Sequence, residues 1–438
     1  MKNIRNYVFW AIDFVTGGKK RAFYEEIRKV YYQTNGYEKI TSQRLSEILS
    51  YAYEKVPFYK GIDCSSITNF PVITKKIINS NYNDFFSTDY INKKNRLRLM
   101  TTSGSTGTTF KVFQNSDKVL RNKIDALFFY EIGNYSLGDR IYSLRVWTHL
   151  NRKKKLSCLK ENLKMIDTSD LCKRNWNSFK SDMLNYSSPK IILAYASSLT
   201  EFLNSLSDEE KKLKWGIKSI FSGAEELPLH VKRELKKVFK CPIVSRYSNQ
   251  EMGIFAQQPI SGEEYFLTND ASYYFEFLKL DSDKNAQEDE IARIVVTDLF
   301  NKAMPLIRYD TGDLCTFGTR NNRKYIKVIQ GRTLDLLKSK SGQIYSPYTI
   351  ILLLWNFKGI IQFQFIQEDL NFIVLRLVHN FENKEQSFKD IEENLRSLFG
   401  KQTTIKIEEV TEIPSEKTGK RRYIISKLNI NDNQTITK

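Results

Sequence analysis

The chain has 438 residues, 41% of them hydrophobic, and its 68 Lys and Arg against 50 Asp and Glu give a formal charge of +18. These values predict a globular protein of two or three domains, and the positive charge favours anionic partners unless it is a general compositional bias. Five cysteines without a CxxC pair argue against a disulfide scaffold and favour a reducing cytosol, and no stretch approaches the roughly 20 apolar residues of a membrane span.

Residues 1–36 are interpreted as an N-terminal extension. Its apolar stretch YVFWAIDFV, residues 7–15, lies between basic flanks but lacks the cleavage site of a signal peptide. Two interpretations stay open: an amphipathic helix at a membrane interface, or a helix whose aromatic side packs on the main domain. From Tyr37 to about Tyr59 the pattern is helical again, and Pro57 ends it.

The central region alternates strand-length apolar runs with amphipathic helical patterns. The predicted strands are 140–147, 216–225 (a strand and turn) and 242–248, and the predicted helices are 197–206 and 227–239. Strands that alternate with helices pair in parallel through crossovers, so this region is expected to be α/β.

After about Ser261 the chain is richer in strands. The expected strands are 273–280, 291–299, 306–317 and 323–331, and in the tail 360–369, 372–381 and 404–410, with a helix over 388–400. The fold class expected is therefore α/β and α+β: a large N-terminal domain over 1–331, with mixed sheets packed by helices, and a small mobile α+β domain over 332–438.

Residues 101–109, TTSGSTGTT, are all Thr, Ser or Gly. Backbone N–H groups and hydroxyls in such a segment can converge on phosphate oxygens, although a plain surface loop has the same composition. The Gly-Lys-Ser/Thr of a P-loop NTPase is missing, so that class is disfavoured.

Four further stretches place chemically useful side chains at long range from this segment. SRYSNQEMG offers the ring of Tyr247 for stacking on a base and the carboxylate of Glu251 for Mg²⁺. RYDTGDLC places Asp313 in a predicted turn, where it can accept both hydroxyls of a ribose. Arg332 falls at the domain junction, and Lys420 lies in a Gly-containing loop as a point charge for a phosphoryl oxygen.

In this order, these stretches resemble the adenylate-forming superfamily of acyl-CoA synthetases from about Lys55 to Lys427. The similarity is greatest to the phenylacetate-CoA ligase-like branch, including members associated with capsular polysaccharide biosynthesis. The stretches that carry it are EKVPFYK, FPVITK, LAYASSL, FSGAEEL and TGKRRYII.

The resemblance implies a role for each matching residue. Residues 102–109 would wrap the ATP phosphates, namely Thr102, Ser103, Gly104, Ser105, Thr106, Gly107, Thr108 and Thr109. The adenine would lie against Gly223, Ala224 and Glu225, with Tyr247 stacked beside it and Ser248 next to it. Gln250 would stand where a phosphate-contacting Thr is usual, and Glu251 would bind Mg²⁺. Asp313 would hold the ribose hydroxyls with help from Arg332, and Lys420 would bridge the attacking carboxylate and the α-phosphate.

Some residues depart from the superfamily pattern. Thr108 and Thr109 stand where many relatives have a Pro, and Lys111 falls one place past the usual Lys. Leu334 replaces the usual Asp or Lys of the hinge, which puts the polar hinge contact in doubt and leaves Asp335 or Gly331 to absorb a domain rotation. His149 is a candidate for the acyl pocket, at the end of a predicted strand.

Each site residue also has a plainer explanation. Tyr247 can be a core aromatic, Glu251 an acid at a helix start and Asp313 a turn residue, while Lys420 lies in a basic run. The basic NRKKK of residues 151–155 either attracts a nucleotide-like acceptor or forms a solvated loop.

The function expected is ATP- and Mg²⁺-dependent adenylation of a small carboxylic acid, with transfer to a thiol of coenzyme A or of a carrier protein. One alternative is a ligase that joins an acyl or amino acid to a sugar amine in surface polysaccharide biosynthesis. Another is a non-catalytic basic module on membrane or nucleic acid, whose binding would be steeply salt-dependent. A cytoplasmic location is expected, with weak attachment to the inner face of the membrane as an option and no nucleic-acid partner.

Overall fold

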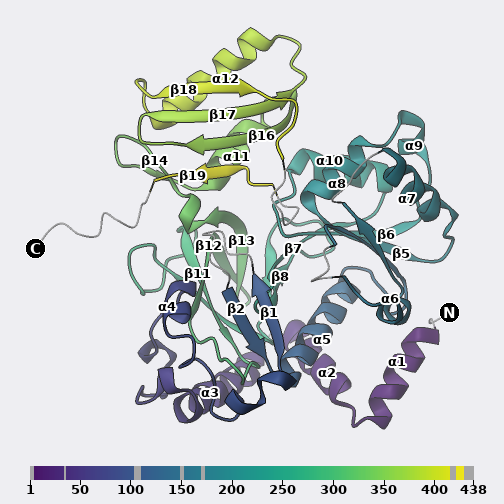
Figure 1. Ribbon diagram of the computed structural model, residues 1–438, viewed down its shortest axis with the longest axis vertical. Helices are drawn as coiled ribbons and strands as arrows, with labels where there is room; N and C mark the ends of the chain where they lie inside the picture. The colour runs from purple at the N-terminus through teal and green to yellow at the C-terminus, as the bar shows by residue number, and fades with distance from the viewer. Residues whose placement is uncertain are drawn as a thin grey trace, which may run out of the picture.

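A computed structural model describes residues 4–33, 36–102, 110–147, 152–168, 173–414 and 421–428 of the chain. Figure 1 shows a large body, in which helices flank a long sheet, and above it a smaller unit formed by the C-terminal part of the chain. This architecture confirms the expected combination of α/β and α+β structure. Within the described ranges, no helix combines the length and apolarity needed to cross a bilayer.

The N-terminal helices pack as a layer against the body. They are α1 (Ile4–Val15), α2 (Lys19–Tyr32) and α3 (Tyr37–Lys55), and the short turns η1 (Pro57–Tyr59), η2 (Ile67–Asn69), α4 (Lys75–Ser80) and η3 (Ile91–Arg96) follow. Between α1 and α2 the chain reverses at Gly17 and Gly18, whose φ values of 99° and 69° are accessible to glycine without strain. The buried carboxylate of Asp13 accepts the backbone N–H of Lys20 and Arg21 at 2.9 and 2.8 Å, so α1 caps the first turn of α2.

A two-stranded antiparallel sheet holds the two ends of the Thr, Ser and Gly segment. It consists of β1 (Arg98–Thr102) and β2 (Phe110–Gln114), with Thr102 opposite Phe110. Helix α5 (Ser116–Ile132) follows β2 directly and enters the body.

The central sheet has eleven strands in the order β10-β11-β12-β13-β9-β8-β7-β6-β5-β3-β4. Its parallel part is β3 (Arg140–Arg145), β4 (Leu163–Asp167), β5 (Lys190–Tyr195), β6 (Ile217–Gly223) and β7 (Ile243–Asn249). The helices between these strands are α6 (Lys155–Glu161), α7 (Lys173–Asn185), α8 (Ala196–Asn204), α9 (Asp208–Lys212) and α10 (Leu229–Phe239). The expected parallel α/β region is therefore present.

The rest of this sheet is antiparallel. It contains β8 (Gly253–Gln257), β9 (Phe266–Thr268), β10 (Tyr273–Leu278), β11 (Ala292–Asp298), β12 (Tyr309–Arg320) and β13 (Arg323–Arg332). The change from parallel to antiparallel pairing occurs at β7, which pairs in parallel with β6 and antiparallel with β8.

The C-terminal unit is a four-stranded sheet, in the order β18-β17-β16-β19, packed against helices. Its elements are η4 (Thr333–Asp335), β14 (Leu337–Lys338), β15 (Ile344–Tyr345), α11 (Pro347–Trp355), β16 (Ile360–Gln367), β17 (Phe372–His379), α12 (Lys384–Phe399), β18 (Thr404–Glu409) and β19 (Ile424–Ser426). It has its own apolar core, which includes Ile350, Phe363, Leu375 and Phe399. We propose a boundary between the two domains at residues 331 and 332. It falls at the end of β13, whose last residue is Arg332.

Several ionised groups are buried where α5 meets the antiparallel strands. Lys118 is fully buried, and its Nζ lies 2.8 Å from Asp298 Oδ2 and 3.0 Å from the hydroxyl of Tyr273. One turn further along α5, the buried guanidinium of Arg121 pairs with Glu26 of α2 at 2.8 Å. Because a buried charge is costly without a partner, these contacts fix how α2, α5 and the strands pack.

Replacing Asp298 by Asn should destabilise the fold strongly. The amide can still accept the backbone N–H of Phe300, which Asp298 Oδ1 now accepts at 2.9 Å, but the charge facing Lys118 is lost. We expect the free energy of unfolding, measured by urea denaturation, to fall by about 3–5 kcal/mol, the usual cost of breaking a buried ion pair. Asp117→Ala is the matched control, because it removes the exposed pair with Lys19 and should cost about 0–1 kcal/mol. Equal effects of the two substitutions would contradict the assigned role of the buried pair.

Candidate active site

The turn between β7 and β8 brings together residues that the sequence analysis singled out. It lies at the carboxyl end of β7, where the sheet changes from parallel to antiparallel pairing, and open α/β sheets bind ligands outside the carboxyl ends of their strands. Tyr247 lies near the end of β7, Glu251 lies in the turn, and Asp313 lies on β12. The hydroxyl of Tyr247 donates to Asp313 Oδ2 at 2.7 Å, so residues 66 positions apart in the chain are in contact.

Glu251 is 4% exposed and is held from three directions. Its Oε1 accepts the hydroxyl of Tyr309 at 3.1 Å and lies 2.9 Å from Nζ of Lys75. Its backbone carbonyl accepts from Nε2 of Gln114, at the end of β2, at 2.8 Å. The carboxylate is therefore fixed in position beside the strand that closes the Thr, Ser and Gly segment.

Lys75 is a site residue that the sequence analysis missed. It is the first residue of α4, whose N-cap Thr74 accepts the backbone N–H of Ile77 at 3.3 Å. Its side chain is 40% exposed, so the ammonium group contacts Glu251 while remaining accessible to solvent. The only available signal was its place in FPVITK, a stretch quoted for its family resemblance and not for its charge.

Asp313 does not lie in a turn after a strand, as predicted, but within β12. The hydrogen bonds of a turn are nevertheless present: Asp310 accepts the N–H of Gly312 at 2.9 Å, and Thr311 Oγ1 accepts that of Asp313 at 3.1 Å. They coincide with an irregularity in the register between β11 and β12 and with a φ of 77° at Gly312. The local turn chemistry was identified correctly, but the strand continues through it.

The surroundings of Asp313 shift its pKa in opposite directions. Burial raises the pKa of this carboxyl above its ordinary value, and the nearby Glu251 charge adds to the rise. Arg332, the Tyr247 hydroxyl and Lys75 oppose it. Burial, together with the contact with Asp313, raises the pKa of Tyr247 well above its ordinary value, so Tyr247 keeps its proton and acts as the donor.

The stretch after β6 was expected to lie against an adenine ring. Gly223 ends β6, and Ala224 has a φ of 69°, a left-handed conformation that is uncommon for a residue with a Cβ. The carboxylate of Glu225 accepts the backbone N–H of Ser197, in the first turn of α8, at 3.0 Å and that of Arg421 at 2.7 Å. Glu225 therefore connects the parallel sheet to a C-terminal segment of the chain.

Arg421 directly follows Lys420 in the sequence and is tied to the large body. Its guanidinium forms an ion pair with Glu201 of α8, and its Nε donates to the carbonyl of Ile413 at 3.2 Å. Its neighbour Arg422 pairs with Asp335, just after β13. This segment is thus held at both the large body and the junction between the two units.

The remaining predicted residues lie around this centre. Arg332 is exposed at the end of β13 and stands opposite Asp313 in the strand register. Gln250 is exposed in the turn before Glu251, Ser248 pairs with Ile254 of β8, and Thr102 ends β1.

Other predicted residues lie outside the described ranges. They are Ser103, Gly104, Ser105, Thr106, Gly107, Thr108 and Thr109 of the expected phosphate segment, His149 and Lys420. Their expected roles stay predictions.

The donor set fits a magnesium ion that arrives with a nucleotide. No group of three or more His, Cys, Asp or Glu able to hold a metal gathers in the part of the chain that the structure describes. Mg²⁺ is commonly bound by one or two carboxylates together with substrate phosphates, and Glu251 supplies one fixed carboxylate. A single fixed carboxylate of this kind suits a Mg²⁺ ion that is shared with phosphate groups.

Comparison with known proteins finds similarity to CapK in sequence and to CoA ligases in fold. Residues 337–427 match the family model of the CapK C-terminal domain. Over 432 residues the chain is 26% identical to the protein CapK of Staphylococcus aureus, covering 93% of this chain and 92% of CapK.

Among solved structures, the chain is similar to 2-hydroxyisobutyryl-CoA ligase in the postadenylation state, in complex with 2-HIB-AMP. The TM-score is 0.70 at 15% identity, over 89% of each chain. The same ligase in the thioesterification state, in complex with 2-HIB-AMP and CoA, gives a TM-score of 0.53 at 16% identity, again over 89% of each chain.

Asp313→Asn should stabilise the fold at neutral pH. The folded-state pKa of Asp313 is raised, so its ionised form weakens the native state above that pKa, and the cost disappears below the unfolded-state pKa of about 3.9. We expect a higher urea midpoint for the variant at pH 7 and no difference from the wild type once the pH is below that of the unfolded-state titration.

The control is a carboxyl whose pKa is shifted in the opposite direction. Hydrogen bonds from Ser65 lower the pKa of the exposed Asp63, so Asp63→Asn should not stabilise the fold at any pH. A lower urea midpoint for Asp313→Asn than for the wild type at pH 7 would contradict the claim that the ionised Asp313 destabilises the native state.

Proposed function

We propose that this chain, which has the fold of the adenylate-forming acyl-CoA ligases and is similar to CapK, activates a carboxylic acid with ATP. The product would be an acyl-adenylate, with release of pyrophosphate. The resemblance predicted from the sequence is thus confirmed for the fold and for the CapK branch. The observation that carries the proposal is the meeting of Lys75, Glu251, Tyr247 and Asp313 at the strand switch, beside the ends of β1 and β2.

The residues at the switch suit the difficulty of this reaction. A carboxylate attacks a polyanionic triphosphate poorly, so the site must neutralise the phosphates and align the attack. Mg²⁺ bound at Glu251 would supply positive charge at the phosphates. Lys75, already 2.9 Å from Glu251, would add a point charge there, and residues 102–109 would contribute backbone N–H groups.

The nucleoside would be recognised by the other half of the site. Asp313 would accept the ribose hydroxyls, with Arg332 opposite it across the strand pair. Tyr247 donates to the same carboxylate and fixes its orientation, while its ring would face the adenine together with residues 223–225.

The arrangement of the C-terminal unit supports the adenylation step. The contacts of Arg421 with Glu225 and Glu201 hold the residue next to Lys420 at the large body. The greater likeness to the postadenylation than to the thioesterification state of one ligase agrees with this placement. Lys420 would then contact the attacking carboxylate and the α-phosphate.

A thiol is the acceptor that we propose for the second step, either coenzyme A or a carrier protein. The alternative acceptor is a sugar amine of a surface polysaccharide, which the similarity to CapK keeps in the proposal. A phenylacetate-CoA ligase-like specificity and a cytoplasmic location also belong to the proposal; the described cysteines Cys64, Cys158, Cys241 and Cys315 are all free thiols.

Carboxylate-dependent exchange of labelled pyrophosphate into ATP tests the activity. Pools of aryl, fatty and amino acids are supplied in turn, with and without Mg²⁺. Exchange with one pool would establish adenylation and name the carboxylate class. No exchange with any pool, together with no ATP binding, would favour a non-catalytic module.

Lys420→Ala should lower the exchange rate by about 10²–10³-fold, as expected when one preorganised donor to the transition state is removed. Lys417→Ala, three residues earlier in the same basic run, is the matched control and should leave the rate unchanged. An undiminished rate of acyl-adenylate formation in Lys420→Ala would show that the assignment is wrong.

Lys75→Ala should raise the KM for ATP and lower kcat/KM of the exchange by about 10- to 150-fold. This range corresponds to the loss of a charged hydrogen bond worth about 1.5–3 kcal/mol. Lys76 is exposed and adjacent in α4, so Lys76→Ala controls for a general effect on the helix. If both variants behave alike, Lys75 does not contact the phosphates.

A further inference from the structure

Helix α1 exposes an apolar face. One side of the helix exposes seven uncharged residues, and Arg5 is exposed at its edge; the seven are Ile4, Tyr7, Val8, Ala11, Ile12, Phe14 and Val15. Phe14 is 83% exposed, and Ile4 and Val15 are each 77% exposed. A continuous exposed face of this kind in a folded protein marks an interaction site more often than chance exposure does.

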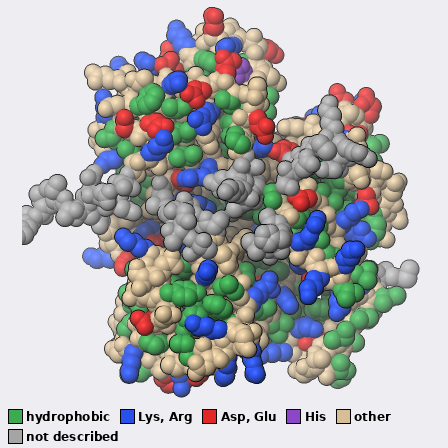
Figure 2. Space-filling view, in the orientation of Figure 1, with side chains coloured by type: hydrophobic (Ala, Val, Ile, Leu, Met, Phe, Trp, Pro, Cys, Tyr) green, Lys and Arg blue, Asp and Glu red, His purple; other side chains and the backbone are tan. Residues whose placement is uncertain are grey.

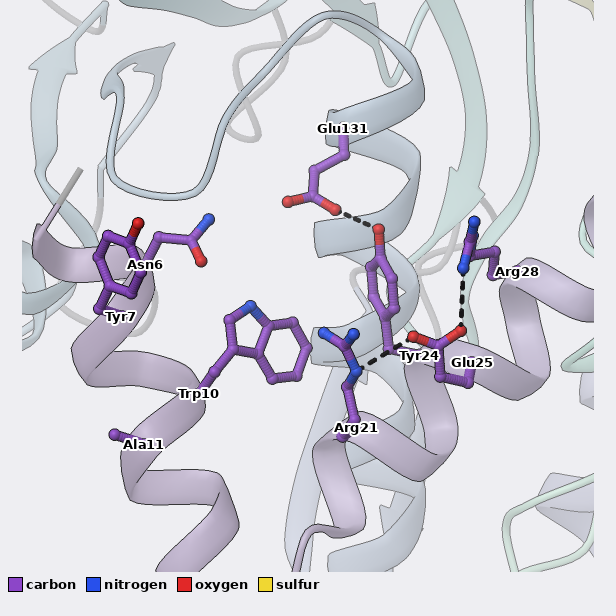
Figure 3. A pocket seen from close by; sticks show the side chains of 9 residues that line it. All are labelled: Asn6, Tyr7, Trp10, Ala11, Arg21, Tyr24, Glu25, Arg28 and Glu131. Carbon is purple, nitrogen blue, oxygen red and sulfur yellow. Dashed lines mark hydrogen bonds and ion pairs between the residues drawn. The ribbon is translucent and has the colours of Figure 1, made fainter. Parts of the chain in front are cut away.

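The opposite side of α1 attaches the helix to the body. Figure 3 shows Trp10 pointing toward Tyr24 of α2, and their ring centroids are 5.5 Å apart. Arg21 lies over the Trp10 ring at 5.0 Å, and the buried Asp13 caps α2. A groove of about 630 Å³ separates the two helices beside these contacts. The helix is therefore fixed in orientation while its apolar face remains uncovered.

A second exposed apolar site lies at the same end of the sheet. Leu156 and Leu159 of α6 are 72% and 67% exposed, and α6 leads into the edge strand β4. Trp10 of α1 and Leu163 of β4 both pack against one apolar cluster, which includes Leu127 and Ile141. Figure 1 shows α6 and α1 at this end of the body.

Basic side chains surround the leucines of α6. Exposed cations lie directly before and within this helix: Arg152, Lys153, Lys154, Lys155 and Lys160. Glu161 pairs with Lys153 and is the one acidic residue of residues 152–161. Figure 2 shows hydrophobic and basic side chains together over this part of the molecule. We call the seven residues of the α1 face, Leu156, Leu159 and these five cations the α1–α6 surface.

We propose that the α1–α6 surface docks on an anionic lipid bilayer, with α1 lying in the plane of the interface. A 12-residue helix is about 18 Å long, too short to span a bilayer but suited to burial at the boundary between headgroups and acyl chains. The apolar face supplies the buried area, and the cations complement anionic headgroups.

The charges disfavour other occupants. A two-fold dimer through this surface would gather the cations of both copies in one interface, to which the α1–α6 surface contributes no acidic residue. A nucleic acid would match the cations, but it offers nothing apolar to cover Phe14 or Ile12. A bilayer satisfies both parts of the surface at once.

Sedimentation of the full chain with lipid vesicles tests the proposal. Vesicles of phosphatidylglycerol and phosphatidylcholine in equal parts should bind the protein, and vesicles of phosphatidylcholine alone should bind it more weakly. The double variant Val8→Gln/Ile12→Gln should partition at least about tenfold less, because both half-exposed side chains lose their apolar area. Glutamine is a good helix former, so α1 should be retained.

Two further variants separate the contributions. Lys154→Gln/Lys155→Gln should weaken binding to the anionic vesicles by about fivefold for each lysine and leave binding to neutral vesicles unchanged. Leu213→Gln/Ile260→Gln is the matched control, because it replaces two aliphatic residues of similar exposure outside the α1–α6 surface. All variants should keep the wild-type rate of pyrophosphate exchange in the absence of vesicles.

Three results would overturn the proposal. The first is that the wild-type chain does not bind anionic vesicles. The second is that the α1 variant and its control lose binding equally. The third is that the wild-type chain dimerises without lipid and the α1 variant is monomeric, which would assign the surface to a second copy. Loss of adenylation in the wild type would leave this test unaffected, because binding to vesicles is measured without substrate.

Discussion

The position of Glu251 depends on a buried ammonium group. The hydroxyl of Tyr273 accepts from Lys118 and donates to the carbonyl of Met252, the residue after Glu251, at 2.6 Å. Lys118 is in turn neutralised by Asp298, so helix α5 and two antiparallel strands hold the turn through one charge. With water excluded, these interactions are strong when complete and costly when incomplete. The rigidity of the site and the stability of the body therefore have the same origin.

The charges of the candidate site, unlike the buried Lys118–Asp298 pair, are only partly compensated. Burial and the charge of Glu251 raise the pKa of Asp313, and Lys75 only partly compensates because it remains accessible to solvent. Two carboxylates held close together in a partly buried site are better stabilised when more positive charge arrives. The Mg²⁺ that accompanies a nucleotide would bring that charge next to Glu251, and the ribose would bring donors to Asp313. We interpret the site as one whose electrostatic cost is relieved by its substrate.

Much of the fold was predictable because burial on one face gives strands and helices a characteristic spacing of apolar residues in the sequence. The runs at 216–225 and 273–280 became β6 and β10, and the helical pattern at 227–239 became α10. The local turn bonds predicted at Asp313 are present, but the predicted end of the strand was wrong, since β12 continues through Asp313 and pairs with Arg332. Lys75 had no local signal: one lysine among 68 basic residues becomes meaningful only through its contact with a residue 176 positions away.

The carboxylate of Glu225 accepts one hydrogen bond from each of two parts of the chain that lie far apart in sequence. Ser197 belongs to the sheet body, whereas Arg421 belongs to the C-terminal segment. In a reaction that moves this segment away, Glu225 would lose a donor, and the left-handed backbone at Ala224 beside it would lose part of its restraint. Departure of the segment would thereby loosen residues 223–225, which are expected to contact the adenine. In the proposed reaction, the side chain of Glu225 would thus couple retention of the nucleotide to the position of the C-terminal unit.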